Sequence, residues 1–401
     1  RGDDRDPAAV GEQLGAGQRG QREHRPDAQA VADVVRSGKW FSGTGSECRE
    51  FAAEWARLHD ARFAVPCSNG THALEIALRA AGVTAGDEVI TTPYTFIATG
   101  AACVQVNAVP IFADVDPASF NLDPASVEAA ITERTRAILV VHIAGNPADL
   151  DALSEIARRK NLLLIEDAAQ AHLSEWRERK VGAIGRARTF SFQASKNLNA
   201  GEGGVVVTDD EETFEQAWSL VNCGRVREGG WYEHRMLSGN FRMTEFQAAL
   251  LRSQMRRLPE QTRLRNENAL YLARALSEIE GILPLTRDER VTCHAYHKFI
   301  FRYRPEAFGG LPRQDFLKAL QAEGIPCHPG YDPMYRSPAF KINPETHPFA
   351  GRVDYSGLHL PGVEQACSEA VWLDQRLLLA PRSELDDIPT AILKIQRAMR
   401  S

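Results

Sequence analysis

Short apolar runs alternate with amphipathic segments along most of the chain. Runs of strand length occupy residues 63–67, 88–91, 109–113, 137–141 and 162–165. Between them, apolar residues recur at helical spacing, as in the stripe Ala73, Leu74, Ala77 and Leu78. Apolar runs separated by helices are typical of parallel strands that are buried on both faces. The pattern therefore predicts an α/β fold with a mostly parallel central sheet flanked by helices.

The middle of the chain adds two strands and a long helical segment. Apolar runs at 189–192 and 204–208 enclose a glycine-rich turn. Residues 244–276 have a helical pattern, and we expect Pro259 to bend or break it, because proline cannot continue the backbone hydrogen bonding of a helix interior.

The two ends of the chain differ from this pattern. Beyond residue 290, a strand at 296–302 and helices near 313–322 and 388–399 predict a smaller C-terminal α+β domain. The first residues lack hydrophobic periodicity altogether. We therefore expect three parts, namely an irregular N-terminal arm over 1–27, a large domain over 28–285 and a small domain over 286–401.

Composition narrows the classes of partner. The chain has 401 residues and a net charge of -6. This charge argues against nucleic acid or an anionic membrane as the main partner, because binding to either needs clustered positive charge. Its apolar runs are far shorter than the roughly 20 residues that span a bilayer. Seven scattered cysteines without a CxxC pair indicate reduced thiols in a cytoplasmic protein. His294 and His297 lack the partner spacing of a metal site, so we expect no metal.

One lysine, Lys196, lies between an apolar strand and the glycine-rich turn. At such a place an amine can be partly desolvated and held close to a ligand. Burial disfavours the ammonium ion and lowers the pKa of lysine, so that the neutral amine can attack an aldehyde and later carry a proton. The segment alone fits an ordinary solvated lysine equally well.

A pair of carboxylates, Glu166 and Asp167, follows the strand at 162–165. The C-terminal end of a parallel strand is where α/β sheets bind ligands. A buried anion there can keep the ring nitrogen of pyridoxal phosphate (PLP) protonated, which this cofactor needs to accept electrons. We favour Asp167 for this role, because neighbouring strand residues point to opposite faces. The alternative is that Asp167 caps the N-terminus of a helix.

Residues 68–74 run from a strand directly into an amphipathic helix. The amides of Gly70 and Thr71 would be free at the N-terminus of that helix, where the helix dipole also favours a phosphate dianion. Phe96 follows the next strand, where its ring could cover one face of a flat cofactor, although core packing explains it as well.

These four segments resemble the fold-type I PLP enzymes, and more closely the DegT/DnrJ/StrS family of sugar and cyclitol aminotransferases. The resemblance covers roughly residues 36–399. Further matching motifs lie at residues 86–90, 110–116, 166–172, 191–196, 201–204, 222–225 and 239–248. Motifs of this length in the same order make the resemblance specific.

The resemblance implies a role for each matching residue. Lys196 is expected to be the Schiff-base lysine and proton shuttle, and Asp167 the partner of the pyridinium nitrogen. The other cofactor contacts that it implies are Gln170 near the phenolic oxygen, Phe96 on the ring, and Gly70, Thr71 and Ser191 on the phosphate.

Three further positions are candidates for substrate contact, namely Arg242, His328 and Tyr331. Asn240 matches an asparagine that the neighbouring subunit donates to the phosphate. The resemblance therefore also implies a homodimer with shared active sites.

As a member of this family, the protein is expected to move an amino group from L-glutamine or L-glutamate to a ketone of a sugar or cyclitol, in aminoglycoside or other secondary-metabolite biosynthesis. Two alternatives stay open. One is a PLP-dependent dehydratase of the aminohydroxybenzoate-synthase type, which keeps its lysine. The other is a non-catalytic PLP-binding regulator, for which the sequence offers no basic face or DNA-binding appendage.

Overall fold

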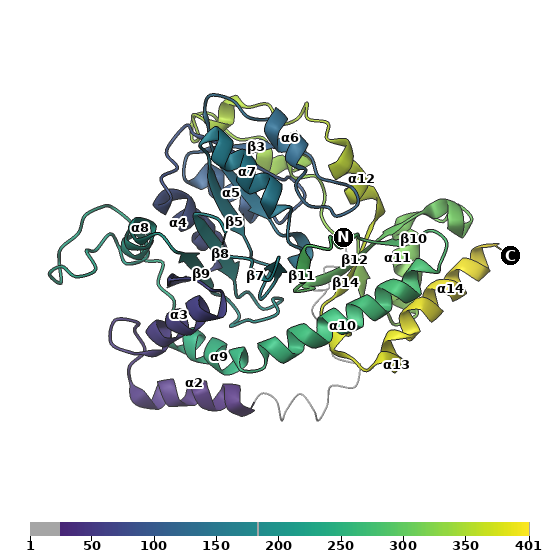
Figure 1. Ribbon diagram of the computed structural model, residues 1–401, viewed down its shortest axis with the longest axis horizontal. Helices are drawn as coiled ribbons and strands as arrows, with labels where there is room; N and C mark the ends of the chain where they lie inside the picture. The colour runs from purple at the N-terminus through teal and green to yellow at the C-terminus, as the bar shows by residue number, and fades with distance from the viewer. Residues whose placement is uncertain (1–24, 183, 401) are drawn as a thin grey trace, which may run out of the picture.

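The computed structural model describes residues 25–182 and 184–400, whose strands form a seven-stranded, a four-stranded and a three-stranded sheet (Figure 1). The large sheet lies in the N-terminal two thirds of the chain. In spatial order its strands are β1 (Phe63–Cys67), β9 (Gly204–Thr208), β8 (Ala187–Ser191), β5 (Leu163–Asp167), β4 (Thr135–Val141), β2 (Glu88–Thr91) and β3 (Val109–Phe112).

The large sheet is mostly parallel, as the sequence predicts. Strands β8, β5, β4, β2 and β3 pair in parallel, and β9 runs antiparallel to both β1 and β8. The C-terminal ends of β1, β2, β5 and β8 therefore meet at one edge of the sheet. At this edge β5 ends with Asp167 and β8 ends with Ser191.

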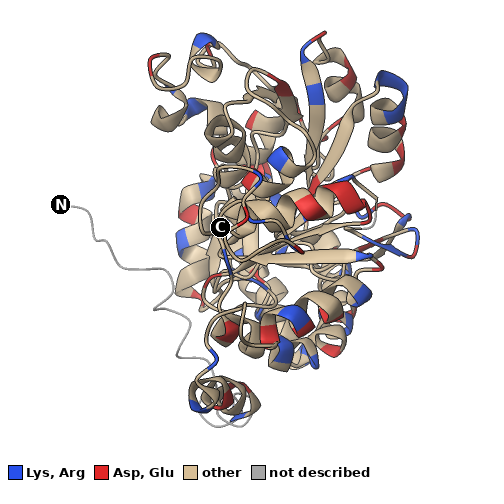
Figure 2. Ribbon diagram, turned by 90° about the vertical axis from the view of Figure 1, so that its left-hand side faces the viewer, with Lys and Arg blue, Asp and Glu red and all other residues tan. Residues whose placement is uncertain are grey.

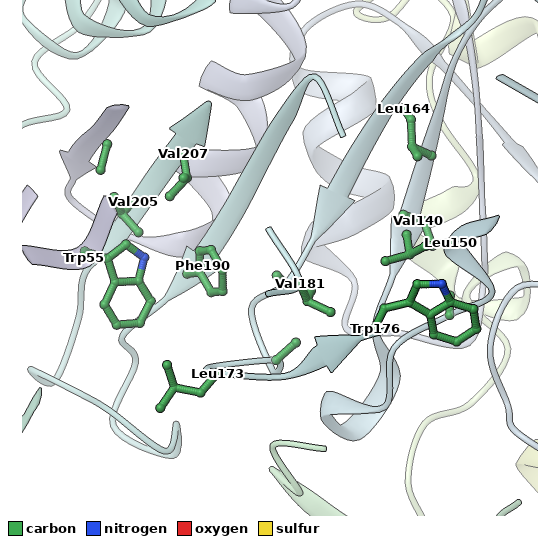
Figure 3. Close-up of a cluster of buried hydrophobic side chains, with 14 of the residues drawn as sticks. Trp55, Val140, Leu150, Leu164, Leu173, Trp176, Val181, Phe190, Val205 and Val207 are labelled. Atoms are coloured by element: carbon green, nitrogen blue, oxygen red, sulfur yellow. The ribbon is translucent and has the colours of Figure 1, made fainter. Parts of the chain in front are cut away.

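Helices cover both faces of the large sheet. These helices are α3 (Glu47–Leu58), α4 (Gly70–Ala80), α5 (Ala98–Gln105), α6 (Pro124–Ala129), α7 (Leu150–Lys160), α8 (Glu211–Val221) and α9 (Glu245–Met255). Two further helices lie outside this set, because α2 (Arg25–Ser37) packs against α9 and α10 (Leu258–Ser277) packs mainly against the four-stranded sheet. Alternate residues of β5 pack on opposite faces, because Leu164 joins the cluster of α3, α6, α7 and α9, and Ile165 joins that of α4, α5 and α8. Figure 3 shows part of the first cluster, with Trp55 beside Phe190 and Val205.

The start of α2 corrects the expected N-terminal arm. Arg25, Pro26 and Asp27 form the first turn of this helix, so the prediction of an irregular arm over residues 1–27 is wrong for its last three positions. Proline and an acidic residue both favour a helix start. Asp27 is buried and its Oδ2 lies 2.6 Å from Nη2 of Arg257. The rest of the arm lies outside the described residues.

The predicted helical segment at 244–276 consists of two helices. Thr244 and Gln247 form a capping box at the start of α9. The break falls between Met255 and Leu258, and Pro259 lies in the first turn of α10, where its missing N–H costs no helical hydrogen bond. The expected break at this proline is confirmed.

The four-stranded sheet is antiparallel and carries its own helices, which confirms the smaller α+β portion. In spatial order its strands are β10 (Ile282–Pro284), β12 (Lys298–Tyr303), β14 (Ala370–Asp374) and β13 (Cys327–His328). The helices are α11 (Arg313–Ala322), α12 (Pro361–Glu369), α13 (Arg382–Leu385) and α14 (Asp387–Arg400). Strand β12 begins two residues later than expected, since Tyr296 has a left-handed backbone (φ 46°) that no regular strand accommodates.

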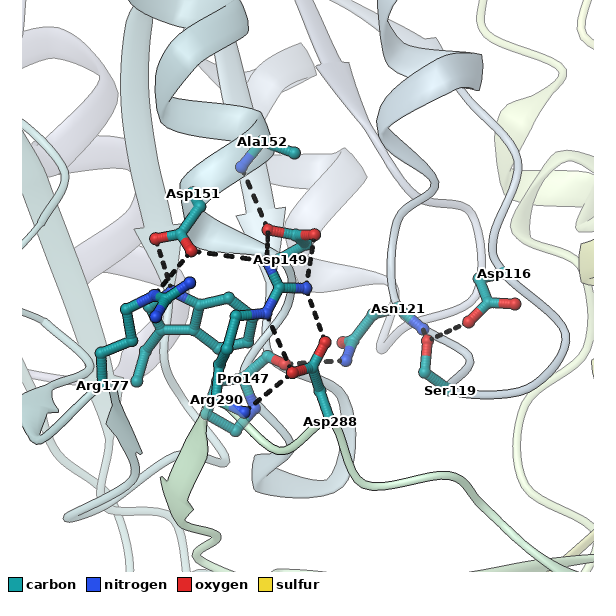
Figure 4. Close-up of polar contacts among 11 residues, drawn as sticks. Asp116, Ser119, Asn121, Pro147, Asp149, Asp151, Ala152, Arg177, Asp288 and Arg290 are labelled. Atoms are coloured by element: carbon teal, nitrogen blue, oxygen red, sulfur yellow. Dashed lines mark hydrogen bonds and ion pairs between the residues drawn. The ribbon is translucent and has the colours of Figure 1, made fainter.

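The expected boundary at residue 285 lies among strands that belong to different sheets. Before it, β10 joins the four-stranded sheet. After it, β11 (Val291–Cys293) pairs with β6 (Glu175–Trp176), which also pairs with β7 (Arg179–Lys180). Arg290 binds Asp149 and Asp288 at 2.8 and 2.6 Å and lies over Trp176 (Figure 4). This network fixes the chain that leads to β12 against α7. The division into domains at this point stays a prediction.

The charged residues of the described chain are of mixed sign along the helices (Figure 2). None of the helices within residues 25–182 and 184–400 is long and apolar enough to cross a membrane. Over the same residues, no group of three or more His, Cys, Asp and Glu side chains is arranged to hold a metal ion.

Candidate active site

A cavity of about 770 Å³ opens at the C-terminal edge of the large sheet and is closed on one side by the four-stranded sheet. Trp372 of β14 donates a hydrogen bond from Nε1 to Oη of Tyr94 at 3.2 Å, which joins the two sides. The predicted site residues that line this cavity are Gly70, Thr71, Phe96, Asp167, Gln170, Ser191, Lys196, His328 and Tyr331. Asn240 and Arg242 do not line it.

Lys196 extends into the cavity from the loop after β8. Two hydrogen bonds hold the loop at Lys196 and at the next residue. The Lys196 amide donates to the Gln193 carbonyl (2.9 Å), and Nδ2 of Asn197 donates to the Ala295 carbonyl (2.7 Å). Desolvation lowers the pKa of Lys196 to about 8; the charge of Asp167 opposes this shift and that of Lys298 reinforces it. Near neutral pH the amine can therefore lose its proton far more readily than a solvated lysine.

Asp167 is buried at the end of β5 with one carboxylate oxygen bound to Thr99. Thr99 Oγ1 donates to Oδ2 at 2.9 Å, and the Ala169 amide donates to Oδ1 at 3.2 Å. Burial raises the pKa of Asp167, while these two hydrogen bonds and the charge of Lys196 oppose the shift. A cationic ring nitrogen in the cavity would favour the carboxylate form. The hydrogen bond from the Ala169 amide closes a turn and does not cap a helix. Asp167 can therefore make this local bond and also bind a ligand.

Glu166 points to the opposite face, as the alternation of strand residues predicts. Its carboxylate accepts hydrogen bonds from the amides of Gly182 (3.0 Å) and Gly185 (2.6 Å), and it lies 3.2 Å from Nε2 of His142. Burial alone would raise the pKa of Glu166, but the hydrogen bond and charge of His142 are the main causes that lower it to about 2. Its acceptors are thus used within the protein, and Asp167 is the carboxylate that faces the cavity.

The start of α4 forms an anion cradle. Asn69 Oδ1 caps the His72 amide at 2.8 Å, and this leaves the amides of Gly70 and Thr71 without an acceptor in the helix. A Cβ atom on Gly70 would lie 2.7 Å from Cβ of Ser191. Only glycine therefore allows the end of β8 to approach this closely, which brings two free amides and a hydroxyl to one corner of the cavity.

Gln170 is held between the two sides of the cavity. Its Oε1 accepts from the Ala144 amide at 2.6 Å, and its Nε2 donates to Oη of Tyr331 at 3.1 Å. The ring of Tyr331 packs edge-on against Trp372. Phe96 is 58% exposed, so its ring is open to a ligand on this wall.

Asn240 and Arg242 lie on the chain between α8 and α9, part of which projects at the left of Figure 1. Asn240 is exposed and bridges to Asn222. The Arg242 guanidinium lies 5.2 Å from the ring centre of Phe41, and its Nη1 donates to Sγ of Cys223 at 3.4 Å. Their expected roles in binding stay predictions.

Sequence reasoning did not single out Thr99, Lys298 or Trp372, all of which line the cavity. Thr99 lies three residues after Phe96, in the first turn of α5, and its amide donates to the Phe96 carbonyl at 3.2 Å. Lys298 is a charged residue at the start of the largely apolar strand β12. Trp372 gave no comparable signal, because tryptophan in an apolar strand is ordinary core.

The DegT/DnrJ/EryC1/StrS aminotransferase family model matches residues 21–377. The chain belongs to this family. It is 43% identical over 390 residues to a Streptoalloteichus tenebrarius protein named as a candidate L-glutamine:3-amino-2,3-dideoxy-scyllo-inosose aminotransferase, covering 94% of each chain. It is 39% identical to the L-glutamine:2-deoxy-scyllo-inosose aminotransferase of Streptomyces fradiae, covering 92% of this chain and 91% of the relative.

The fold agrees with that of solved family members. The crystal structure of 3-amino-5-hydroxybenzoic acid synthase superposes with a TM-score of 0.85 at 34% identity, covering 93% of this chain and 96% of the other. The protein is thus a fold-type I, PLP-dependent aminotransferase of the DegT/DnrJ/EryC1/StrS family.

The residues present fit PLP. The cavity has an amine of lowered pKa for its aldehyde, a buried carboxylate for its ring nitrogen and a glycine-dependent cradle for its phosphate. These groups come from three strand ends that meet at one edge of the sheet. Lys196, Asp167 and the Gly70–Ser191 corner are therefore the residues that could hold the cofactor.

Proposed function

We propose that the protein transfers the amino group of L-glutamine to the ketone of a cyclitol in aminoglycoside biosynthesis. The observation that carries the proposal is the cavity in which Lys196, Asp167 and the anion cradle meet. The similarity to proteins named as glutamine:inosose aminotransferases supports the choice of donor and acceptor.

Each residue would have a defined task. When bound, PLP withdraws electrons from the substrate carbon that carries the nitrogen. Lys196 would hold the cofactor and, once released by the substrate, would take a proton from that carbon of the donor in one half of the cycle and give a proton to the matching carbon of the acceptor in the other half, acting as acid and as base in each. Asp167 would keep the ring nitrogen protonated. The amides of Gly70 and Thr71 and the hydroxyl of Ser191 would bind the phosphate.

The wall opposite the cofactor residues supports a polyhydroxylated acceptor. His328 and Tyr331 face the cavity from the small-sheet side, and both carry groups that hydrogen-bond to hydroxyls. Burial lowers the pKa of His328, so its imidazole is neutral near pH 7 and can either donate or accept a proton in such a bond.

The central experiment uses purified enzyme, L-glutamine and a panel of inososes and ketosugars. The expected result is a product in which the carbonyl oxygen of the ketone is replaced by a hydrogen and an amino group, formed together with the 2-oxo acid of glutamine. A dehydrated product without transfer of nitrogen would instead indicate the aminohydroxybenzoate-synthase type of reaction. Cyclitol and nucleotide-sugar ketones in the same panel distinguish the acceptor classes.

A homodimer with shared active sites is part of the proposal. The chain between α8 and α9 exposes Trp231, Tyr232 and Leu237, and an apolar surface of this kind favours a protein partner. Mixing Lys196→Ala with Asn240→Ala protein tests it, since a mixed dimer has one site with both residues intact. Recovery of activity supports sharing, and no recovery despite subunit exchange contradicts it.

We also infer a cytoplasmic location. All seven cysteines are free, and five of them are buried. Free thiols of this kind persist in a reducing compartment. Labelling of thiols in cell extracts prepared under acid quench tests this, because disulfide formation would contradict it.

A further inference from the structure

A second lysine, Lys298, lines the same cavity as Lys196 from the opposite side. Lys298 is the first residue of β12 and is buried. The two lysines come from different sheets but are tied together locally, because Asn197 binds the carbonyl of Ala295, three residues before Lys298. Two of the eight lysines of the chain thus meet in one cavity.

The surroundings of Lys298 carry more positive than negative charge. Its Nζ donates to Oδ2 of Asp374 at 3.2 Å. Asp374 also pairs with Arg376, which is largely solvated, at 3.1 Å. Its charge also acts on Arg265, which is 2% exposed, and opposes the lowering of the pKa of Arg265 by burial. One carboxylate therefore faces three cations, two of them buried.

Arg265 has little else to balance its charge. Its Nε donates to the side-chain oxygen of Gln375 at 2.9 Å, and its Nη1 is buried without a hydrogen-bond partner among the described residues. Arg265 does not line the cavity, so a ligand can reach this positive region only through Lys298. Burial of excess positive charge is costly and favours binding of an anion.

The two substrates of the proposed function differ in charge. Glutamine carries an α-carboxylate, whereas a cyclitol ketone is neutral. Lys196 is the residue expected to hold the cofactor, which leaves Lys298 as the other lysine on the cavity wall among the described residues. His297 and His328 beside it have pKa values lowered first by burial, so both are neutral near pH 7.

We infer that Lys298 binds the α-carboxylate of the amino donor, exchanging Asp374 for the substrate as its partner. In the other half of the cycle, when the neutral acceptor occupies the cavity, Lys298 pairs with Asp374 again. One site can thereby accept a charged and a neutral substrate in turn. This role rests on the proposed function, and it makes Lys298 the residue that distinguishes the charged donor from the neutral acceptor.

The test uses two probes that cannot react. One is 5-amino-5-oxopentanoate, which is glutamine without its α-amino group, and the other is pentanediamide, its neutral analogue. Calorimetry on the cofactor-loaded enzyme gives the dissociation constant of each. We expect Lys298→Met to weaken binding of the anionic probe roughly 10- to 100-fold, the range for a hydrogen bond to a charged group, and to change that of the diamide less than about threefold.

Two variants serve as controls. Lys298→Arg keeps the charge and should bind the anionic probe within roughly tenfold of wild type. Lys318→Met removes an exposed lysine on α11 and should change neither constant. An unchanged absorption spectrum of the bound cofactor in Lys298→Met shows that the cavity is intact. Rapid-mixing measurements should show slower deamination of glutamine at low concentration, with the acceptor half-reaction nearly unaffected.

Two outcomes would overturn the inference, namely equal binding of the anionic probe by wild type and Lys298→Met, or equal weakening of both probes. Failure of the proposed function has a different signature, because wild-type enzyme would then release no 2-oxo acid from glutamine whatever the probes show.

Discussion

The two walls of the cavity are built in different ways. The wall on the large sheet is made of strand ends, with Asp167 on β5, Ser191 on β8 and Gly70 at the start of α4. The opposite wall is made of side chains from the smaller sheet and its loops, among them Lys298, Tyr331 and Trp372. Backbone geometry thus positions the residues proposed to hold the cofactor. On the other wall, side chains that extend from the smaller sheet and its loops are proposed to contact the substrates.

Local charge balance separates the walls further. On β5, Glu166 has its acceptors filled by amides and His142, whereas its neighbour Asp167 keeps one side toward the cavity. Behind the opposite wall, Asp374 pairs with both Lys298 and Arg376. The first wall is suited to a cofactor that stays bound, and the second is suited to substrates that bind and dissociate in each cycle.

The largest effect is expected from Lys196→Ala. Loss of both the cofactor attachment and the proton carrier should lower kcat by about 10⁴-fold or more and abolish the violet absorption band of the bound cofactor, which borohydride also removes. Lys318→Ala, on the exposed face of α11, is the matched control and should leave both unchanged. If the band persisted in Lys196→Ala, this lysine would not be the attachment point.

Asp167→Asn and Glu166→Gln should separate chemistry from stability on one strand. Asp167→Asn should lower kcat by roughly 10³-fold, because a neutral amide cannot hold the ring nitrogen protonated, and should change thermal stability little. Glu166→Gln breaks a fully buried charge network and should cost about 3 kcal/mol of stability, with residual activity in the folded fraction. Steady-state rates and thermal unfolding measure the two effects, and the reverse pattern would contradict the assignment.

Gly70→Ala should loosen the cofactor without affecting its chemistry. The new Cβ would lie 2.7 Å from Cβ of Ser191, and overpacking of this kind costs about 1–3 kcal/mol, or roughly 5- to 150-fold in affinity. Equilibrium dialysis of the apoenzyme against PLP measures it. Gly357→Ala, where a Cβ meets nothing within 4 Å, is the control. Equal affinities in the two variants would place the phosphate elsewhere.

The contrast between the two walls also explains which parts of the site the sequence alone could predict. Asp167, Gly70 and Lys196 were predictable because strand–helix junctions place residues at a known edge of the sheet. Lys298 and Trp372 reach the cavity only after the smaller sheet folds back, a long-range contact that hydrophobic periodicity does not encode. The start of β12 was displaced for a related reason, since the left-handed residue Tyr296 follows Ala295, whose amide and carbonyl bind Gly145 and Asn197 far away in the sequence.

The helical segments show a similar division. The break near Pro259 follows from local backbone chemistry and was predictable. The first turn of α2 combines local and long-range causes, because Pro26 and Asp27 favour a helix start and Asp27 also pairs with Arg257, which is distant in sequence. Local rules therefore predicted the elements and the cofactor side of the site, and tertiary contacts decided the rest.

The smallest effect concerns pH and joins the two walls. Only the neutral amine of Lys196 can recapture PLP, so the rate of recapture by the apoenzyme should rise with pH and reach half its maximum near pH 8 instead of 10.5. Lys298→Met removes a like charge, which favours the ammonium form of Lys196 and should move this midpoint upward. Asp167→Asn removes the opposing charge and should move it downward. Stopped-flow absorbance across roughly pH 6–10, about two units on either side of the midpoint, measures both shifts, with Lys318→Met as the control. Shifts of the same sign in the two variants would show that the walls do not act on Lys196 through their charges.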